Sequence, residues 1–270
     1  MSAETSDELD PLSDPGEVDR EDGDGRAPLS AAPKSVTPGP KSVTPGAVGR
    51  AWAIAAVVTI ASFAALSYAF LPGNAGRPVV IGTIGATYLA LTVATVIWLR
   101  RRGELLDKLA PRRLDITIGA FVALVLYLLA VVFHTFVTSS GPQMGWMMRI
   151  YMQIGDSRVT GSFAVGLIVL AVAAAEEIVW RGLVMGALAR AYRPRKAWLI
   201  TSALYAVAHL STIYLLRDPT GGPNPLLFAA AAFCGLVWGY LATAIDRVAP
   251  SVFAHAVFTW AIVEFPLWRM

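Results

Sequence analysis

Two glutamates and one arginine interrupt a long apolar stretch in the second half of the chain. They lie in Ala173-Ala-Ala-Glu176-Glu177-Ile-Val-Trp180-Arg181. An ionised side chain near the centre of a membrane costs about 2.5–3.5 kcal/mol, even on the scale with the smallest penalties. Three uncompensated charges would therefore cost roughly 8–10 kcal/mol, as much as the stability of a whole domain. We conclude that these side chains are paired, hydrated or used in chemistry.

The spacing of the three charges predicts different roles for the two glutamates. Glu177 and Arg181 are four residues apart, so they share one face of a helix. Glu176 points about 100° away around the same helix. One carboxylate is thus held by the arginine while the other can face a cavity. Mutual shielding at the cytoplasmic edge is the alternative interpretation, but it leaves the second glutamate without a partner.

Two of the three histidines lie in apolar runs on the same membrane side as the glutamates. They are His209 and His255, whereas His134 is interpreted as an interfacial or packed residue. A carboxylate and two imidazoles can activate water in two ways. Glu176, His209 and His255 can bind a divalent metal such as Zn²⁺ with one open water position. Alternatively, Glu176 acts as a general base without metal, on a water that the imidazoles position.

Each of these histidines has a companion one helical turn away. Tyr205 precedes His209 by four residues, and Thr259 follows His255 by four. Tyr205 can form a wall of the cavity or donate a hydrogen bond, and Thr259 can orient a ring nitrogen or stabilise an oxyanion. Plain packing and a threonine bonded to its own backbone are equally good interpretations.

The composition predicts that membrane helices position these residues. The 270 residues are 56% hydrophobic and only 15% charged, with a mean hydropathy of +0.57. Soluble domains average about 45–50% apolar and about 25% charged residues. The single cysteine, Cys234, excludes an internal disulfide framework and a cysteine-cluster metal site.

We therefore predict an all-α, polytopic membrane bundle of about seven helices, with an eighth left open. A span needs about 20 apolar helical residues to cross a hydrocarbon core about 30 Å thick. The predicted spans are Ala51–Leu71, Val79–Leu99, Ile116–Val137, a run from Ser162 past Trp180, Trp198–Leu216, Leu226–Ile245 and Ser251–Trp268.

Residues 1–50 are expected to form a disordered tail ahead of a membrane domain at 51–270. Residues 1–26 hold ten acidic residues against two arginines, so the basic excess belongs to the membrane part and does not indicate nucleic-acid binding. Residues 27–50 are rich in Pro, Ser, Ala and Gly and contain the tandem repeat Pro-Lys-Ser-Val-Thr-Pro-Gly at 33–39 and 40–46. Prolines and the lack of apolar residues argue against a fold there.

Basic residues in two loops orient the bundle. Arginines and lysines gather in the segments 100–113 and 190–196, which are expected to be cytoplasmic. Both placements are compatible with seven spans and put the N-terminus in the cytoplasm. The expected localisation is a multi-pass protein of a cell membrane, the bacterial inner membrane.

The motifs on these spans resemble those of the CPBP intramembrane proteases. This family includes type II CAAX prenyl endopeptidases and bacteriocin-processing or self-immunity proteins. Its signature, E-E-x-x-x-R, F-x-x-x-H and H-x-x-x-N on three helices, resembles Glu176-Glu177-x-x-x-Arg181, Tyr205-x-x-x-His209 and His255-x-x-x-Thr259 here. The resemblance covers about residues 160–268. It implies that Glu176 activates water, that both histidines position it or a metal, and that Glu177 and Arg181 are structural and electrostatic.

Two positions depart from this signature. Tyr205 replaces Phe, which is a mild change, and Thr259 replaces Asn, which removes an amide from the expected oxyanion site. The resemblance implies an endopeptidase that cleaves near the cytoplasmic side. Its expected partners are membrane lipid and a polypeptide with a hydrophobic or lipidated C-terminal segment, a sorting signal or a leader peptide.

Other functions leave different sequence patterns. H-E-x-x-H, G-x-G-D, G-x-S-x-G and nucleotide-binding glycine loops are all absent. The remaining alternative is non-enzymatic: an immunity or scaffold protein, or a proton-coupled transporter that uses the same polar cluster. A transporter is expected to have two related halves, whereas here the polar residues concentrate in the second half.

Overall fold

A computed structural model describes residues 45–154 and 162–267, and within these ranges the chain is helical without a β-strand. The α-helices are α1 (Pro45–Ala69), α2 (Pro78–Arg101), α3 (Leu105–Leu109), α4 (Arg113–Phe133), α5 (Met144–Ile154), α6 (Ser162–Glu177), α7 (Gly186–Ala189), α8 (Pro194–Ala208), α9 (Thr212–Leu215), α10 (Leu226–Ile245) and α11 (Ala249–Glu264). A 3₁₀ turn η1 (Pro72–Asn74) and two π-helical segments, η2 (His134–Thr138) and η3 (Ile178–Met185), complete the path. The predicted all-α class is confirmed.

Each predicted span overlaps helical structure. The span Trp198–Leu216 is divided into α8 and α9, and α11 ends at Glu264, before the predicted limit at Trp268, which lies outside the described residues. Five helices of the described part are long and apolar enough to cross a membrane: Gly46–Ala69, Pro78–Arg101, Arg113–Thr138, Pro194–Leu215 and Leu226–Ile245. Helix α11 is apolar but shorter. Large apolar side chains such as Phe136 (82% exposed) stand on the outer surface of the helices. The chain is therefore an integral membrane protein, and the number of seven crossings stays a prediction.

The start of α1 differs from the expectation. The helix begins at Pro45, within the segment that we expected to be disordered up to residue 50. A proline is tolerated at the first position of a helix, because its missing N–H has no helical partner there. Pro78 and Pro194 begin α2 and α8 in the same way, and Pro250 is the second residue of α11. The predicted disorder of residues 1–44 lies outside the described residues.

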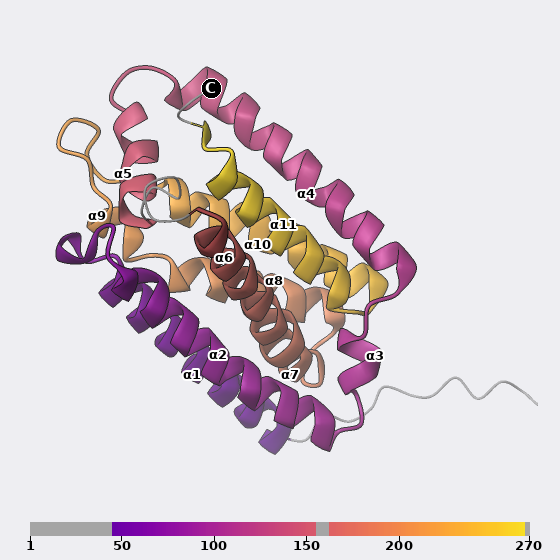
Figure 1. The fold of residues 1–270 in the computed structure, drawn as a ribbon. Helices are drawn as coiled ribbons and strands as arrows, with labels where there is room; N and C mark the ends of the chain where they lie inside the picture. Colours follow the sequence, from indigo (N-terminus) through magenta and orange to yellow (C-terminus); the bar gives the residue numbers. More distant parts are fainter. Residues whose placement is uncertain (1–44, 155–161, 268–270) are drawn as a thin grey trace, which may run out of the picture. The chain divides into compact units, whose positions relative to one another are not determined.

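Helix α6, which ends at the two glutamates, lies between the pair α1 and α2 and the pair α4 and α11 (Figure 1). It packs between α2 and α11, and α11 also contacts α4 and α10. Helix α10 packs against α8, and α1 contacts both α2 and α8. The three helices that carry the predicted motifs, α6, α8 and α11, therefore surround a common interior.

Glycines permit the closest of these contacts. A Cβ atom on Gly119 of α4 would lie 2.5 Å from the Cβ of Phe253 and 2.8 Å from the carbonyl oxygen of Pro250, both on α11. A Cβ on Gly239 of α10 would lie 2.4 Å from the Trp198 ring on α8. The two helix pairs can approach this closely only where a side chain is missing.

We expect Gly119→Ala to destabilise the protein by about 1–3 kcal/mol, because the added methyl forces α4 and α11 apart. The measurement is the melting temperature in detergent. Gly82→Ala on α2 is the matched control, since a Cβ there meets nothing within 4 Å. An equal melting temperature for the two variants would contradict the close approach of α4 and α11.

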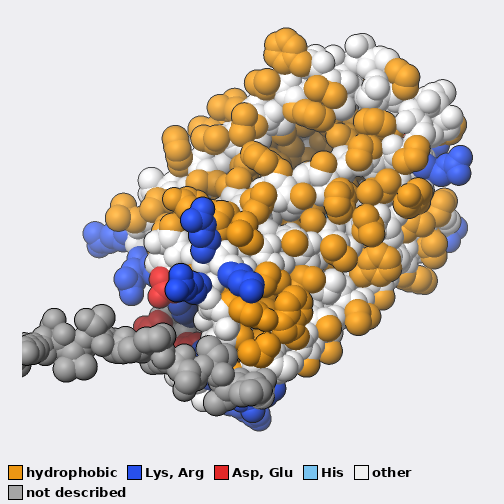
Figure 2. All heavy atoms as spheres, turned by 180° about the vertical axis from the view of Figure 1, so that it is seen from behind, with side chains coloured by type: hydrophobic (Ala, Val, Ile, Leu, Met, Phe, Trp, Pro, Cys, Tyr) orange, Lys and Arg blue, Asp and Glu red, His pale blue; other side chains and the backbone are white. Residues whose placement is uncertain are grey.

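Charged residues gather at the ends of the helices, and an apolar surface lies between them (Figure 2). At the end that holds the basic loops, Glu104 pairs with Arg190 at 2.5 Å and Lys108 pairs with Asp246 at 2.6 Å. Arg247 pairs there with Asp115. These pairs join the loop after α2 to α7 and to the turn between α10 and α11.

The opposite end contains α5, which the sequence analysis did not predict. The Gln153 amide donates to the carbonyl oxygens of Ala69 and Leu71, and the Tyr151 hydroxyl donates to the carbonyl oxygen of Ile262. These bonds tie α5 to the end of α1 on one side and to α11 on the other.

Candidate active site

The helix that carries the charged cluster changes its winding directly after the glutamates. Glu176 and Glu177 are the last residues of α6, and the π-helical segment η3 follows. Such wide turns are frequently found at functional sites. Within η3, the Arg181 Nη1 donates to the Glu177 Oε1 at 2.7 Å, and neither side chain is exposed. The ion pair expected from the four-residue spacing is therefore present.

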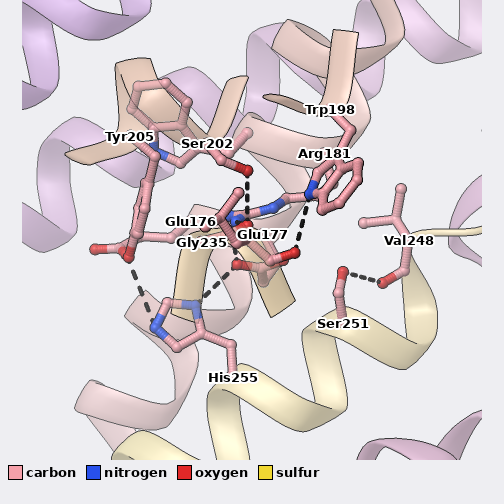
Figure 3. Close-up of polar contacts among 12 residues, drawn as sticks. Glu176, Glu177, Arg181, Trp198, Ser202, Tyr205, Gly235, Val248, Ser251 and His255 are labelled. Atoms are coloured by element: carbon pink, nitrogen blue, oxygen red, sulfur yellow. Dashed lines mark hydrogen bonds and ion pairs between the residues drawn. The ribbon is translucent and has the colours of Figure 1, made fainter. Parts of the chain in front are cut away.

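Arg181 is fixed from several sides (Figure 3). Its Nη2 donates to the carbonyl oxygen of Gly235 on α10 at 2.9 Å, and the Ser202 hydroxyl donates to the same oxygen. The guanidinium also lies 5.0 Å from the centre of the Tyr205 ring. A cation held by a carboxylate, a carbonyl dipole and an aromatic face is compensated well enough to remain buried.

His255 connects the two glutamates. Its Nδ1 lies 3.0 Å from the Glu177 Oε1, and its Nε2 lies 4.0 Å from the Glu176 Oε2. An ionised Glu177 only accepts hydrogen bonds, so the Nδ1 carries the proton. A neutral His255 therefore presents its Nε2 as an acceptor toward Glu176. The Trp238 ring stacks on the imidazole with centroids 3.7 Å apart and fixes the ring plane.

Glu176 faces different surroundings from Glu177. The Tyr205 hydroxyl donates to its Oε2 at 2.9 Å, and the side chain lines a cavity of about 820 Å³. Glu177 and Arg181 do not line this cavity. The division of roles predicted from the helical spacing, with one glutamate paired and the other at a cavity, agrees with this arrangement.

His209 ends α8 and lies on the same cavity. Its Nδ1 lies 2.8 Å from the carbonyl oxygen of Tyr205, which can only accept, so a neutral His209 presents its Nε2 as an acceptor. Thr259, one turn after His255, is half-buried on the same wall. The structure thus brings Glu176, Tyr205, His209, His255 and Thr259 to one cavity.

Apolar side chains form the rest of the cavity wall. They come from α1, α2, α4, η2, α5, α6, α10 and α11. Phe136 and Phe233 belong to this lining and are also exposed on the outer surface. The cavity therefore extends from the polar cluster toward the surface that faces lipid.

Some residues of the cluster were not predicted from the sequence. Trp238, Ser202 and the carbonyl group of Gly235 hold His255 and Arg181 in place, yet none of them is charged. In the sequence, the pair Gly235 and Gly239 indicates close packing of helices and nothing more. His134 contacts Thr138 and takes no part in the cluster, as expected.

The predicted metal ligands are Glu176, His209 and His255. Within residues 45–154 and 162–267, no three His, Cys, Asp or Glu side chains are grouped so that they could hold one ion. The polar contact of His209 is with Tyr205, and only His255 approaches Glu176. Metal use stays a prediction, which metal analysis of the wild type and of His209→Ala checks.

Residues 158–261 match the model of the family described as type II CAAX prenyl endopeptidase Rce1-like. The matched segment contains all the motif residues predicted above and overlaps the expected core at about 160–268. This similarity supports intramembrane protease activity in general and a peptide substrate in a membrane setting. No curated protein and no solved structure gives a significant match to the chain.

Proposed function

We propose that this protein is an intramembrane endopeptidase in which Glu176 is the general base. The observation that carries the proposal is the position of this carboxylate. It lies inside a membrane helix, at the polar end of an apolar cavity, with an acceptor nitrogen of His255 at 4.0 Å. An ionisable side chain that is buried in a membrane helix and faces a cavity is a candidate for function, because its burial is costly for stability.

The distance between Glu176 and His255 suits one water molecule. Two acceptors 4.0 Å apart can each lie about 2.8 Å from a single water oxygen. The two hydrogens of the water then point at the two acceptors, and a lone pair of its oxygen points into the cavity. Such a water is oriented to attack a carbonyl carbon that lies there.

The proton transfers follow from this geometry. The water oxygen bonds to the peptide carbonyl carbon while its proton moves to Glu176. The protonated Glu176 then gives this proton to the amide nitrogen as the C–N bond breaks, which leaves a carboxylic acid and an amine. Glu177 and Arg181 hold the tautomer of His255 and do not touch the substrate.

The developing oxyanion needs a donor on the cavity wall. When neutral, His209 and His255 both present their Nε2 as an acceptor. The Tyr205 hydroxyl already donates to Glu176, and Thr259 carries the other hydroxyl of the motif residues, which can donate. We expect Thr259→Val to lower kcat about 10²–10³-fold, the usual effect of removing one oxyanion donor.

Two conservative variants complete this test. Thr259→Ser keeps the hydroxyl, and Thr259→Asn supplies an amide donor, so both are expected to retain activity. Steady-state kinetics on the purified variants checks these values. If Thr259→Val cleaves as fast as Thr259→Ser, the hydroxyl has no part in the reaction.

The substrate is a polypeptide with an apolar or lipidated segment. The apolar lining of the cavity, continuous with Glu176, supports this class, which includes C-terminal sorting signals, CAAX-like ends and leader peptides. Glu176 lies midway along the continuous helical stretch from Ser162 to Ala189. We therefore propose that the cleaved bond lies at the depth of Glu176 and that the substrate reaches it from within the membrane.

The test is hydrolysis by the purified protein in lipid vesicles. Peptides of these classes are incubated in ¹⁸O-labelled water and analysed by mass spectrometry. One ¹⁸O atom in each new C-terminal carboxylate is expected. Binding of the same peptides without cleavage would instead favour a scaffold or immunity role.

A further inference from the structure

A tyrosine of α2 reaches the charged cluster, although no motif of the sequence lies on that helix. Helix α2 packs against both α6 and η3, the two segments that meet after Glu177. The Tyr88 side chain of α2 is completely buried, and its hydroxyl accepts a hydrogen bond from the Trp180 Nε1 at 3.1 Å. Neither Tyr88 nor Trp180 lines the cavity that holds Glu176. An effect of Tyr88 on the reaction therefore has to act through other side chains.

Trp180 connects Tyr88 to Tyr205. The indole is fully buried, so its N–H needs an acceptor, and the Tyr88 hydroxyl supplies one. The Trp180 and Tyr205 rings meet edge to face, with centroids 5.3 Å apart and an angle of 79° between the planes. The rings of His209 and Trp238 also contact Tyr205, with centroids at 4.8 and 6.4 Å. Aromatic rings thus hold the Tyr205 ring, and Trp180 is the member of this group that α2 fixes.

The Tyr205 hydroxyl in turn fixes the carboxylate of Glu176. It donates at 2.9 Å to the Oε2, the same oxygen that lies 4.0 Å from the His255 Nε2. A carboxylate oxygen can accept two hydrogen bonds. While one lone pair accepts from Tyr205, the other is directed to the water proposed above. A displaced Tyr205 ring would let the carboxylate turn, and misplacement of a catalytic group by about 1 Å can lower a rate by about 10²-fold.

We propose that Tyr88 is a positioning residue of the active site. Its hydroxyl holds the Trp180 indole, and the indole holds the Tyr205 ring. The Tyr205 hydroxyl then keeps Glu176 in the orientation in which it meets the water. The path consists of two hydrogen bonds, of 3.1 and 2.9 Å, joined by one aromatic contact. This role rests on the proposed hydrolysis, and it gives α2 a part in the reaction.

The first test is steady-state cleavage by Tyr88→Phe, which removes only the hydroxyl. We expect kcat to fall by about 10- to 10²-fold, because Glu176 is no longer held in place. KM is expected to stay unchanged, because Tyr88 does not line the cavity. An unchanged kcat in folded Tyr88→Phe protein, or a change in KM alone, would overturn the proposal.

Tyr127→Phe is the matched control for this variant. It removes a hydroxyl from α4 that donates to the carbonyl oxygen of Phe265, and Tyr127 does not line the cavity. We expect kcat and KM of this variant to equal those of the wild type. An equal fall of kcat in both tyrosine variants would show that any lost hydroxyl slows the enzyme, and it would overturn the specific role of Tyr88.

Double variants separate positioning from a general effect on the fold. In a Tyr205→Phe background the hydroxyl that holds Glu176 is absent, so Tyr88→Phe is expected to cause no further fall in kcat. Residues that act through one another have non-additive effects, whereas independent effects add. The same fall in both backgrounds would mean that Tyr88 only supports the fold. If Tyr88→Phe does not fold, Trp180→Phe takes its place in the same cycle, because it removes the donor of the bond instead of the acceptor.

A measurement without substrate separates this role from the proposed function. The chain has eight tyrosines, so labelling with 3-fluorotyrosine gives a small set of ¹⁹F NMR signals. The signal that is missing in Tyr205→Phe belongs to Tyr205. We expect it to shift in Tyr88→Phe and to keep its position in Tyr127→Phe. An unchanged Tyr205 signal in Tyr88→Phe would overturn the path through Trp180. A shifted signal in a protein that cleaves no peptide would contradict the proposed function and leave the hold of Tyr88 on Tyr205 standing.

Discussion

Replacement of Glu176 by glutamine is expected to abolish peptide cleavage while the protein remains folded. The amide is nearly isosteric with the carboxylate, and its oxygen can still accept the hydrogen bond from Tyr205. It cannot take a proton from water. General-base catalysis contributes about 10²–10⁴-fold to a rate, so kcat is expected to fall by at least the lower figure. The measurement is cleavage of the best peptide substrate by purified variants in vesicles.

Two controls separate loss of the base from loss of charge. Asp107→Asn makes the same chemical change at an exposed site and is expected to have no effect. Glu177→Gln removes the other glutamate, which is not in contact with the cavity, and is expected to impair the reaction less than Glu176→Gln. Retained cleavage by folded Glu176→Gln protein would reject Glu176 as the base. A larger loss of kcat in Glu177→Gln protein that is shown to be folded would exchange the two roles.

The sequence alone predicted which side chains are neighbours within a single helix. Four-residue spacing predicted the bond between Glu177 and Arg181 and the contact of Tyr205 with His209, because neighbours on one helical face depend only on the helical repeat. The relative depth of His255 was harder to predict. His255 lies only four residues after the start of its predicted span at Ser251, which suggests a shallower position than that of Glu176, whereas in the structure it lies 3.0 Å from Glu177 and 4.0 Å from Glu176. Its depth depends on where α11 begins and on how closely α11 crosses α4 at Gly119.

Three further features had no signal in the sequence. Helix α5 is only 11 residues long, so it forms no apolar run of membrane-spanning length. The π-helical segment η3 alters the direction of side chains after Glu177, although a regular helix was the natural assumption. A second cavity, with Arg181 and Arg247 in its lining, is formed at the junction of several elements, where small residues such as Gly186 and Ala242 leave space. Such space arises only from three-dimensional packing.

Removal of the Arg181 side chain is expected to have the largest effect on stability. In Arg181→Met, the fully buried Glu177 carboxylate loses the guanidinium that pairs with it. The carbonyl oxygen of Gly235 loses the donor from Arg181 and keeps the one from Ser202. Breaking a buried ion pair by removing one partner costs about 3–5 kcal/mol, because the other charge stays buried and uncompensated. We expect a large fall in the melting temperature and a loss of cleavage.

The double variant Arg181→Met with Glu177→Gln distinguishes stability from catalysis. Replacing both partners of a buried pair by neutral groups is often close to neutral for stability, so most of the melting temperature is expected to return. Cleavage is not expected to return to the wild-type rate. A neutral amide can donate to as well as accept from the Nδ1 of His255, so it no longer fixes the tautomer that presents the Nε2 as an acceptor to water. Recovery of both properties would mean that the Glu177–Arg181 pair only stabilises the fold. Recovery of stability alone would show that the pair positions His255 for the reaction.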